Sequence, residues 1–272
     1  MRPETFDRFR EFLEKNSGIL LGPDKQYLVE TRLARLVRAN NLASVDALID
    51  QLLRSRDRRL AQEVVDAMTT NETLWFRDGY PFRALEQKFF PEAREKRVNP
   101  YRIWSAACST GQEAFSISMV AEEMNLPFKV EIIGTDISEN VVNKARTGVF
   151  DDLSLGRGLS AERKRQYFVK HAEGWQLTPA VRRRVRFEVG NLLDINPPVR
   201  HYNLIFCRNV LIYFSRETKA KIIDRLANAL TLDGYLLLGA SESINRLSDR
   251  FEAERLPGGG TAYKLKPRPA AR

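Results

Sequence analysis

Between residues 1 and 68, apolar residues recur every three or four positions, which is the spacing of one face of an α-helix. Phe6, Phe9 and Leu13 form the first such face. The segments QYLVETRLARLVRANN, SVDALIDQLL and RLAQEVVDAM repeat the pattern. The sequence therefore predicts a small all-helical domain over residues 1–68.

From residue 101 onward, short apolar runs alternate with amphipathic segments of helical period. The expected strands span residues 101–107, 129–136, 185–191, 203–209 and 234–240. The expected helices span residues 112–124, 138–147 and 215–231. Apolar strands that alternate with helices indicate a parallel sheet covered on both faces. The final segment FEAERLPGGGTAYKLK predicts a hairpin, so the sheet should end with an antiparallel strand.

Residues 150–184 interrupt this alternation. SAERKRQYF predicts a short helix, and HAEGWQLTP a small β excursion after it. We therefore expect a β-subdomain of about residues 150–184, inserted in a larger domain over residues 99–272. Residues 69–98 then form a linker and a first helix.

Composition places the chain among ordinary folded proteins, with 43% hydrophobic and 29% charged residues. No run approaches the roughly 18 apolar residues of a membrane span, and the N-terminus lacks the apolar core of a signal peptide. We expect a cytoplasmic protein with no membrane insertion. The two cysteines, Cys108 and Cys207, belong to no Cys/His cluster. They predict reduced, buried thiols and no metal site.

The net charge of +9 raises nucleic acid, anionic lipid or an acidic protein as partner. Residues 25–59 hold eight basic and four acidic side chains. Arg32, Arg35 and Arg38 lie on the predicted helix opposite its apolar face. A second basic cluster lies in VRRRVRF. For either cluster taken alone, a solvated surface with a small excess of charge is as good an explanation as a binding site for such a partner.

Polar residues follow the first two predicted strands, where a parallel sheet binds its ligands. The turn CSTGQE has one glycine, Gly111, so it does not fit a dinucleotide's G-x-G-x-x-G motif. Glu113 occupies the first helical turn, where a phosphate would otherwise bind. S-adenosylmethionine fits, because it carries cationic groups and no phosphate, and Asp136 would accept from its ribose hydroxyls. An ordinary helix-start Glu and a capping Asp remain equal alternatives.

The triplet Asn196-Pro197-Pro198 resembles the Asn-Pro-Pro-aromatic signature of amino-group methyltransferases. It precedes the fourth strand instead of ending it, and Val199 replaces the aromatic residue. We therefore interpret it as a turn.

Six segments together resemble the chemotaxis protein methyltransferases of the CheR type. They are TTNETLWFRD, IWSAACSTGQEAFSI, IIGTDIS, GNLLD, FCRNVLIYF and LLLGASES. The resemblance implies an α/β fold, a Rossmann-like class I S-adenosylmethionine-dependent methyltransferase domain with a small β-subdomain insertion. A small all-helical domain precedes it.

The resemblance also implies site residues. Those expected at the cofactor are Asn71, Thr73, Arg77, Glu113, Asp136, Asn191, Leu192, Cys207, Arg208 and Asn209. Leu192 and Cys207 would contribute backbone or packing only. Arg77 and Tyr213 are expected to position the substrate carboxylate. Arg32, Arg35 and Arg38 would bind the receptor.

The implied reaction is methylation of glutamate side chains on chemoreceptor cytoplasmic helices, with S-adenosylhomocysteine as product and no metal. A glutamate of pKa about 4.3 is already ionised, so no general base is needed. We expect a monomer that binds no nucleic acid. Some members of the resembling family use the β-subdomain to bind a peptide at the receptor's C-terminal tail. HAEGWQLTP is short compared with the corresponding connection in those members, so we expect no dependence on such a tail peptide. The alternatives are a nucleic-acid methyltransferase and a non-catalytic S-adenosylmethionine-binding regulator.

Overall fold

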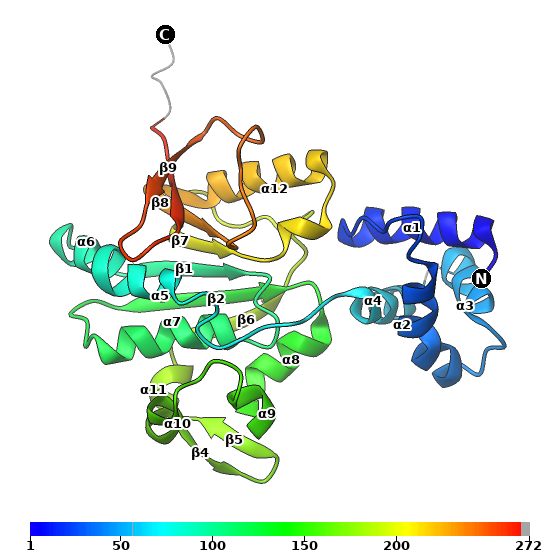
Figure 1. Ribbon diagram of the computed structural model, residues 1–272, viewed down its shortest axis with the longest axis horizontal. Coiled ribbons are helices and arrows are strands. Elements are labelled where there is room, and N and C mark those ends of the chain that lie inside the picture. The colour runs from blue at the N-terminus through cyan, green and yellow to red at the C-terminus, as the bar shows by residue number, and fades with distance from the viewer. Residues whose placement is uncertain (56, 268–272) are drawn as a thin grey trace.

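The computed structural model describes residues 1–55 and 57–267 and has two parts (Figure 1). The N-terminal part contains four helices, and a long connection leads from it to a sheet covered by helices. The four helices are α1 (Pro3–Ser17), α2 (Gln26–Ala39), α3 (Val45–Arg54) and α4 (Arg58–Met68). Their apolar faces meet in a core of their own, which includes Phe9, Leu13 and Leu33.

Local chemistry sets the ends of these helices. Ser44 accepts the Ala47 N–H at the start of α3, and Asp57 accepts two N–H groups at the start of α4. Helix α1 ends at Gly18, whose φ of 77° is the left-handed conformation that glycine adopts without strain. The chain then turns back toward the sheet domain.

The linker runs from Thr69 to Gly79 and continues into a helix that contains one wider turn. This helix comprises α5 (Tyr80–Ala84), the π-helical η1 (Leu85–Phe89) and α6 (Phe90–Glu95). Within η1, the Phe90 N–H bonds to the Leu85 carbonyl, five residues earlier. Pro91 supplies the reason, since it has no N–H and its ring would crowd the preceding α-helical turn.

The main sheet has seven strands in the order β6-β2-β1-β7-β8-β10-β9, and the first five are parallel. The antiparallel β10 and β9 form the expected terminal hairpin. The strand bounds are β1 (Tyr101–Ala106), β2 (Val130–Asp136), β6 (Val185–Val189), β7 (Tyr202–Cys207), β8 (Leu230–Leu238), β9 (Phe251–Arg255) and β10 (Thr261–Leu265).

Helices and apolar side chains cover both faces of this sheet. Successive residues of β1 point to opposite faces, so Ile103 belongs to one buried cluster and Trp104 to the other. The covering helices include α7 (Gln112–Glu123), α8 (Glu139–Thr147) and α12 (Arg216–Ala229), and the short 3₁₀ helix η2 (Leu211–Tyr213) lies in the loop after β7. The expected α/β fold, a parallel sheet covered on both faces that ends in an antiparallel hairpin, is confirmed.

Strand β8 begins earlier than its apolar run indicates. It pairs with β7 from Leu230, before the expected start at residue 234. The pairing register shifts between Tyr202 and Leu204 of β7. The polar residues at the start of β8 therefore join the sheet through an irregularity. Periodicity does not detect such a segment, because its side chains do not alternate regularly.

The insertion after α8 forms a separate three-stranded sheet in the order β3-β5-β4. Its elements are β3 (Val149–Phe150), α9 (Asp152–Leu155), α10 (Ala161–Tyr167), β4 (Phe168–His171), β5 (Gly174–Leu177) and α11 (Pro179–Arg182). The linker packs directly against it, because the Trp75 ring lies 4.9 Å from Phe150 and 5.6 Å from Phe168.

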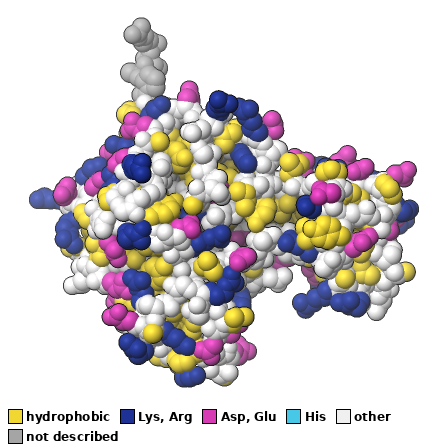
Figure 2. All heavy atoms as spheres, viewed as in Figure 1, with side chains coloured by type: hydrophobic (Ala, Val, Ile, Leu, Met, Phe, Trp, Pro, Cys, Tyr) yellow, Lys and Arg dark blue, Asp and Glu magenta, His cyan; other side chains and the backbone are white. Residues whose placement is uncertain are grey.

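Basic side chains do not form a single patch on the face shown in Figure 2, where they are spread over both parts of the molecule.

None of the described helices is long and apolar enough to cross a membrane.

Candidate functional site

A cavity of about 280 Å³ lies where the linker, the carboxyl ends of four parallel strands and the helical domain meet. It lies beside the loops that follow β1 and β7, where the strand order reverses. Most of the predicted site residues line it, namely Arg32, Asn71, Thr73, Arg77, Glu113, Asp136, Asn191, Leu192, Arg208, Asn209 and Tyr213.

Three predicted residues do not line this cavity. Arg35 and Arg38 lie on α2 as exposed side chains. Cys207 is fully buried at the end of β7, so its side chain is not available to a ligand there. Cys108 does line the cavity, but burial raises the pKa of both thiols well above the usual value. Both cysteines are free and buried, as the sequence predicted, and both remain protonated.

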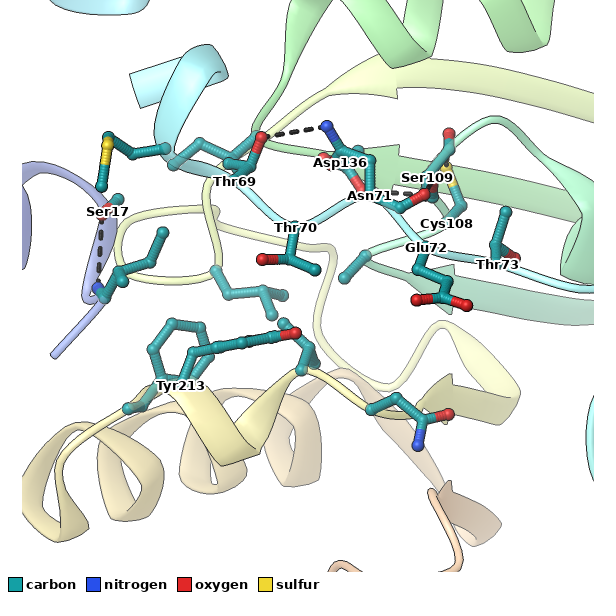
Figure 3. Close-up of a pocket in the computed structure, with 18 of the residues that line it drawn as sticks. Ser17, Thr69, Thr70, Asn71, Glu72, Thr73, Cys108, Ser109, Asp136 and Tyr213 are labelled. Carbon is teal, nitrogen blue, oxygen red and sulfur yellow. Dashed lines mark hydrogen bonds between the residues drawn. The ribbon is translucent and has the colours of Figure 1, made fainter. Parts of the chain in front are cut away.

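The linker crosses the cavity as an irregular segment that is bound to the loop after β1 (Figure 3). The Ser109 hydroxyl donates to the Asn71 carbonyl oxygen at 2.8 Å. The Asn71 side-chain amide donates to the Thr69 hydroxyl oxygen at 3.0 Å. In the same view, the Thr70 side chain points from the linker toward Tyr213. The linker, which connects the two parts of the chain, is thus also one wall of the site.

Asp136, at the end of β2, is held by backbone donors. Its two oxygens accept the N–H groups of Ser109 at 2.8 Å and Ser138 at 3.0 Å. Burial raises the pKa of the Asp136 carboxyl, although these donors act to lower it. The carboxylate is therefore fixed in direction at the edge of the cavity.

The buried Arg208 and the partly buried Glu113 form an ion pair beneath the linker. Arg208 Nη1 lies 2.8 Å from Glu113 Oε2, and the Ser105 hydroxyl donates to Glu113 Oε1 at 2.7 Å. Arg208 Nη2 pairs with Asp78 at 2.6 Å and donates to the Arg77 carbonyl at 2.9 Å. Burial would lower the pKa of Arg208, but Glu113 and Asp78 raise it. Arg208 therefore connects β7, α7 and the linker.

Arg77 and Tyr213 line the cavity with polar groups that have few partners. The nearest acceptor of the Arg77 guanidinium is the Glu72 carbonyl oxygen at 3.5 Å, a long contact. Within residues 1–55 and 57–267, the structure contains no ion pair of Arg77 and no hydrogen bond of the Tyr213 hydroxyl. Both groups are thus available to a ligand.

The helical domain closes one side of the cavity. The Leu20 N–H donates to the Tyr213 carbonyl at 2.8 Å, and Ile19 forms an isolated bridge with Phe214. The Asn191 side-chain amide donates to the Asn16 carbonyl at 2.8 Å. Sequence reasoning missed this wall, because the short loop after α1 carries no motif.

Arg32 contacts the linker in this structure. Its guanidinium donates to the Met68 and Thr69 carbonyls and, at 2.9 Å, to the Thr70 hydroxyl. It therefore holds the start of the linker against α2. Its predicted contact with a receptor stays a prediction.

Three further residues with structural roles at the site escaped the sequence analysis. Ser109 and Asp78 lie inside the recognised segments CSTGQE and TTNETLWFRD, so their positions were the available signal. Glu242 lies in LLLGASES, and its carboxylate binds the loop after β7. Its partners are backbone groups, which a sequence does not display.

The arrangement fits S-adenosylmethionine. The carboxylates of Glu113 and Asp136 complement cationic groups and ribose hydroxyls, respectively. The buried Arg208 Nε has no acceptor among the described residues, which leaves one donor beside the cavity. The described residues contain no group of three or more His, Cys, Asp or Glu side chains that could hold a metal ion.

Solved structures that match part of this chain include the PH0226 protein from Pyrococcus horikoshii, with 12% identity, a TM-score of 0.41, and coverage of 69% of this chain and 90% of that one. An S-adenosylmethionine-dependent methyltransferase from Mesorhizobium loti has 16% identity, a TM-score of 0.35, and coverage of 65% and 63%.

Sequence comparisons identify both parts of the chain. Residues 4–69 match the family "CheR methyltransferase, all-alpha domain", and residues 71–258 match "CheR methyltransferase, SAM binding domain". The chain is 48% identical to the chemotaxis protein methyltransferase of Vibrio parahaemolyticus, over 97% of each chain. It is 46% identical to chemotaxis protein methyltransferase 1 of Pseudomonas aeruginosa, over 96% of this chain and 97% of that one. The chain therefore belongs to the CheR family of S-adenosylmethionine-binding chemotaxis methyltransferases.

Proposed function

We propose that this protein methylates glutamate side chains on the cytoplasmic helices of chemoreceptors, with S-adenosylmethionine as methyl donor. The observation that carries the proposal is one cavity that combines Glu113 and Asp136 with the available polar groups of Arg77 and Tyr213. The first two suit the donor, and the second two suit a carboxylate substrate.

The residues proposed to hold the donor surround the ends of β1, β2, β6 and β7. Glu113 and Asp136 would bind its cationic groups and ribose, while Asn71, Thr73, Arg208 and Asn209 line the same cavity. Leu192 and the backbone near Asn191 would pack near the adenine. The bound donor supplies a methyl group on a positively charged sulfur.

The histidines and the cysteines offer no general base in the cavity. Neither His171 nor His201 lines it, and the Cys108 thiol that does is kept protonated by burial. A substrate that is already ionised needs no base, and a glutamate of pKa about 4.3 meets this condition. A carboxylate electron pair forms the new O–CH₃ bond, and the electrons of the S–CH₃ bond remain on sulfur. The products are a neutral ester and a neutral thioether.

Arg77 and Tyr213 would orient the reacting carboxylate. A charge-assisted bond from Arg77 and a hydroxyl bond from Tyr213 can hold one oxygen while the other stays free to react. Alignment of this kind supplies as much as ~7 to 11 kcal/mol in favourable intramolecular reactions. The neutral ester forms no ion pair with Arg77, which favours product release.

The exposed side chains of Arg35 and Arg38 would guide an acidic receptor helix toward the cavity. Arg32 is less suited to this task, because its guanidinium is engaged by the linker. A monomer without a requirement for a receptor tail peptide completes the proposal.

Methylation of nucleic acid is less well supported. Asn196-Pro197-Pro198 precedes β7, away from the strand end where an amino group would be held. A non-catalytic regulator would not need the available side chains of Arg77 and Tyr213.

One assay separates these functions. The protein is incubated with methyl-labelled S-adenosylmethionine and either a receptor cytoplasmic fragment or RNA. Alkali releases methanol from carboxyl methyl esters but not from methylated bases. We expect base-labile label on the receptor fragment only. Label on RNA would support the nucleic-acid alternative, and donor binding without label on either would support the regulator.

A further inference from the structure

Glu242 follows β8 and lies outside the cavity lining, and its carboxylate accepts four backbone hydrogen bonds. Oε2 accepts the N–H groups of Gly239 and Asn209, both at 2.7 Å. Oε1 accepts the N–H groups of Val210 at 3.0 Å and Leu211 at 2.8 Å. Among the described residues, no basic side chain forms an ion pair with it. One carboxylate thus joins the loop after β7 to the turn after β8.

Three of these donors are successive residues of a single loop. Asn209 has a φ of 57°, in the left-handed region. Residues other than glycine are uncommon there, and asparagine is among those that adopt it most readily. Val210 follows at φ −126° and ψ −34°, and the 3₁₀ helix η2 begins after it. Successive N–H groups that converge in this way form a concave binding site for an anion. Here the anion is the protein's own carboxylate.

The turn after β8 is shaped for the same contact. A Cβ atom on Gly239 would lie 2.7 Å from Glu242 Oε2 and 2.7 Å from Asn209 Nδ2. Only glycine therefore allows the carboxylate to approach the loop at hydrogen-bond distance. Gly239 and Glu242 form one structural unit within LLLGASES.

The loop that Glu242 holds carries site residues at both ends. Arg208 and Asn209 line the cavity at its start, and Tyr213 lines it at the end of η2. The Tyr213 carbonyl also accepts the Leu20 N–H, so the loop further sets the contact with the helical domain.

We propose that Glu242 is a positioning residue for methyl transfer. It touches neither donor nor substrate, and it acts by fixing the backbone of residues 209–211, and through it Asn209 and Tyr213. This inference rests on the proposed function for its kinetic consequence, but its structural part can be measured without a substrate.

Glu242→Gln tests the inference with little change in side-chain volume. It replaces one acceptor oxygen with an NH₂ group that must face two N–H donors. We expect kcat to fall about 10²-fold, the loss that a misplacement of ~1 Å can cause, with a smaller change in the Kd of S-adenosylmethionine. Glu242→Asp keeps two acceptor oxygens on a shorter stem and should retain more activity than the glutamine variant. A role in packing alone predicts the opposite order, because glutamine fills the same space and aspartate leaves a gap.

Amide hydrogen exchange provides the readout that needs no substrate. The amides of residues 209–211 should exchange faster in Glu242→Gln than in the wild type. Asp57→Ala is the control, because it also removes a carboxylate that accepts two backbone N–H groups, but at the start of α4. It should leave exchange at residues 209–211 and kcat unchanged.

The outcomes are distinguishable. A wild-type protein that forms no base-labile ester contradicts the proposed function. Unchanged exchange at residues 209–211 in Glu242→Gln overturns the positioning inference, whatever the substrate proves to be. Faster exchange with an unchanged kcat in an active enzyme overturns it as well. If Glu242→Gln does not fold, Glu242→Asp decides by the same two measurements, with faster exchange and a lower kcat than wild type expected.

Discussion

The buried Arg208 forms an ion pair with the partly buried Glu113, with 2.8 Å between Nη1 and Oε2, beneath the linker that crosses the site. The pair joins the end of β7 to the first turn of α7. Because Asp78 completes the arrangement at 2.6 Å, the same arginine also holds the linker. Changes at this pair should therefore affect both donor binding and the position of the linker.

Glu113→Gln should weaken S-adenosylmethionine binding by at least tenfold, or about 1.4 kcal/mol. The substitution keeps the shape of the side chain but removes the negative charge that complements a cationic ligand and Arg208. Isothermal titration calorimetry measures the loss. Glu122→Gln, near the other end of α7, is the control and should bind the donor normally. An unchanged Kd for Glu113→Gln would show that Glu113 contributes to the ion pair with Arg208 and not to donor binding.

Arg77→Ala should lower kcat for receptor methylation by about 10²-fold, because the substrate carboxylate loses its orienting charge. The thermal midpoint should change little, since the guanidinium makes only one long contact, at 3.5 Å. Steady-state kinetics and a thermal melt measure the two effects. Arg83→Ala, on α5, is a matched control outside the cavity lining. Equal kinetics for the two variants would contradict the role of Arg77.

Trp75→Ala should behave in the opposite way and destabilise the fold by about 3 to 5 kcal/mol. Trp75 is 1% exposed, and its ring packs from the linker onto the insertion, against Phe150 and Phe168. Chemical denaturation measures the free energy of unfolding. If the variant were as stable as the wild type but failed to bind the donor, Trp75 would be a ligand contact instead of a packing residue.

The double variant Arg35→Glu with Arg38→Glu should raise KM for the receptor fragment and leave the Kd of S-adenosylmethionine unchanged. Both side chains are exposed on α2, so their attraction to an acidic helix should weaken with salt. Arg54→Glu with Arg58→Glu is the control of equal charge change in the same domain. Unchanged receptor kinetics at low ionic strength would refute a docking role for α2.

The affinity for S-adenosylmethionine should decline as the pH falls. The decline should begin at a higher pH than it would for an aspartate of ordinary pKa. Burial raises the pKa of Asp136, so the group takes up a proton earlier as the pH falls and loses an acceptor for the ribose. The effect of this pKa shift on folding stability has the opposite dependence on pH. A raised folded pKa makes the folded state bind the proton more tightly, so this group's contribution to stability decreases as the pH rises.

Asp136→Asn should remove this part of the pH dependence. Donor affinity measured by calorimetry at several values from about pH 7 downward checks it, with donor protonation identical for both proteins. A variant with the same pH profile as the wild type would place the titrating group elsewhere.

Much of the fold followed from local sequence. Periods of helical spacing identified the four N-terminal helices, and apolar runs identified five parallel strands, because burial of one face leaves a regular pattern. Short irregular elements did not follow. The early start of β8 and the π turn at Leu85–Phe89 depend on register and on Pro91, and neither produces a regular apolar period.

The sequence by itself determined the types of residue available at the site, including Glu113, Asp136, Arg77 and Tyr213, and their order along the chain. Only the tertiary structure decided their partners. It engaged Arg32 with the linker, buried Arg208 between two carboxylates, and directed four backbone N–H groups at Glu242. The physical reason is that a side chain's chemistry is local, whereas the donor or acceptor that satisfies it is supplied by segments brought together only when the chain folds.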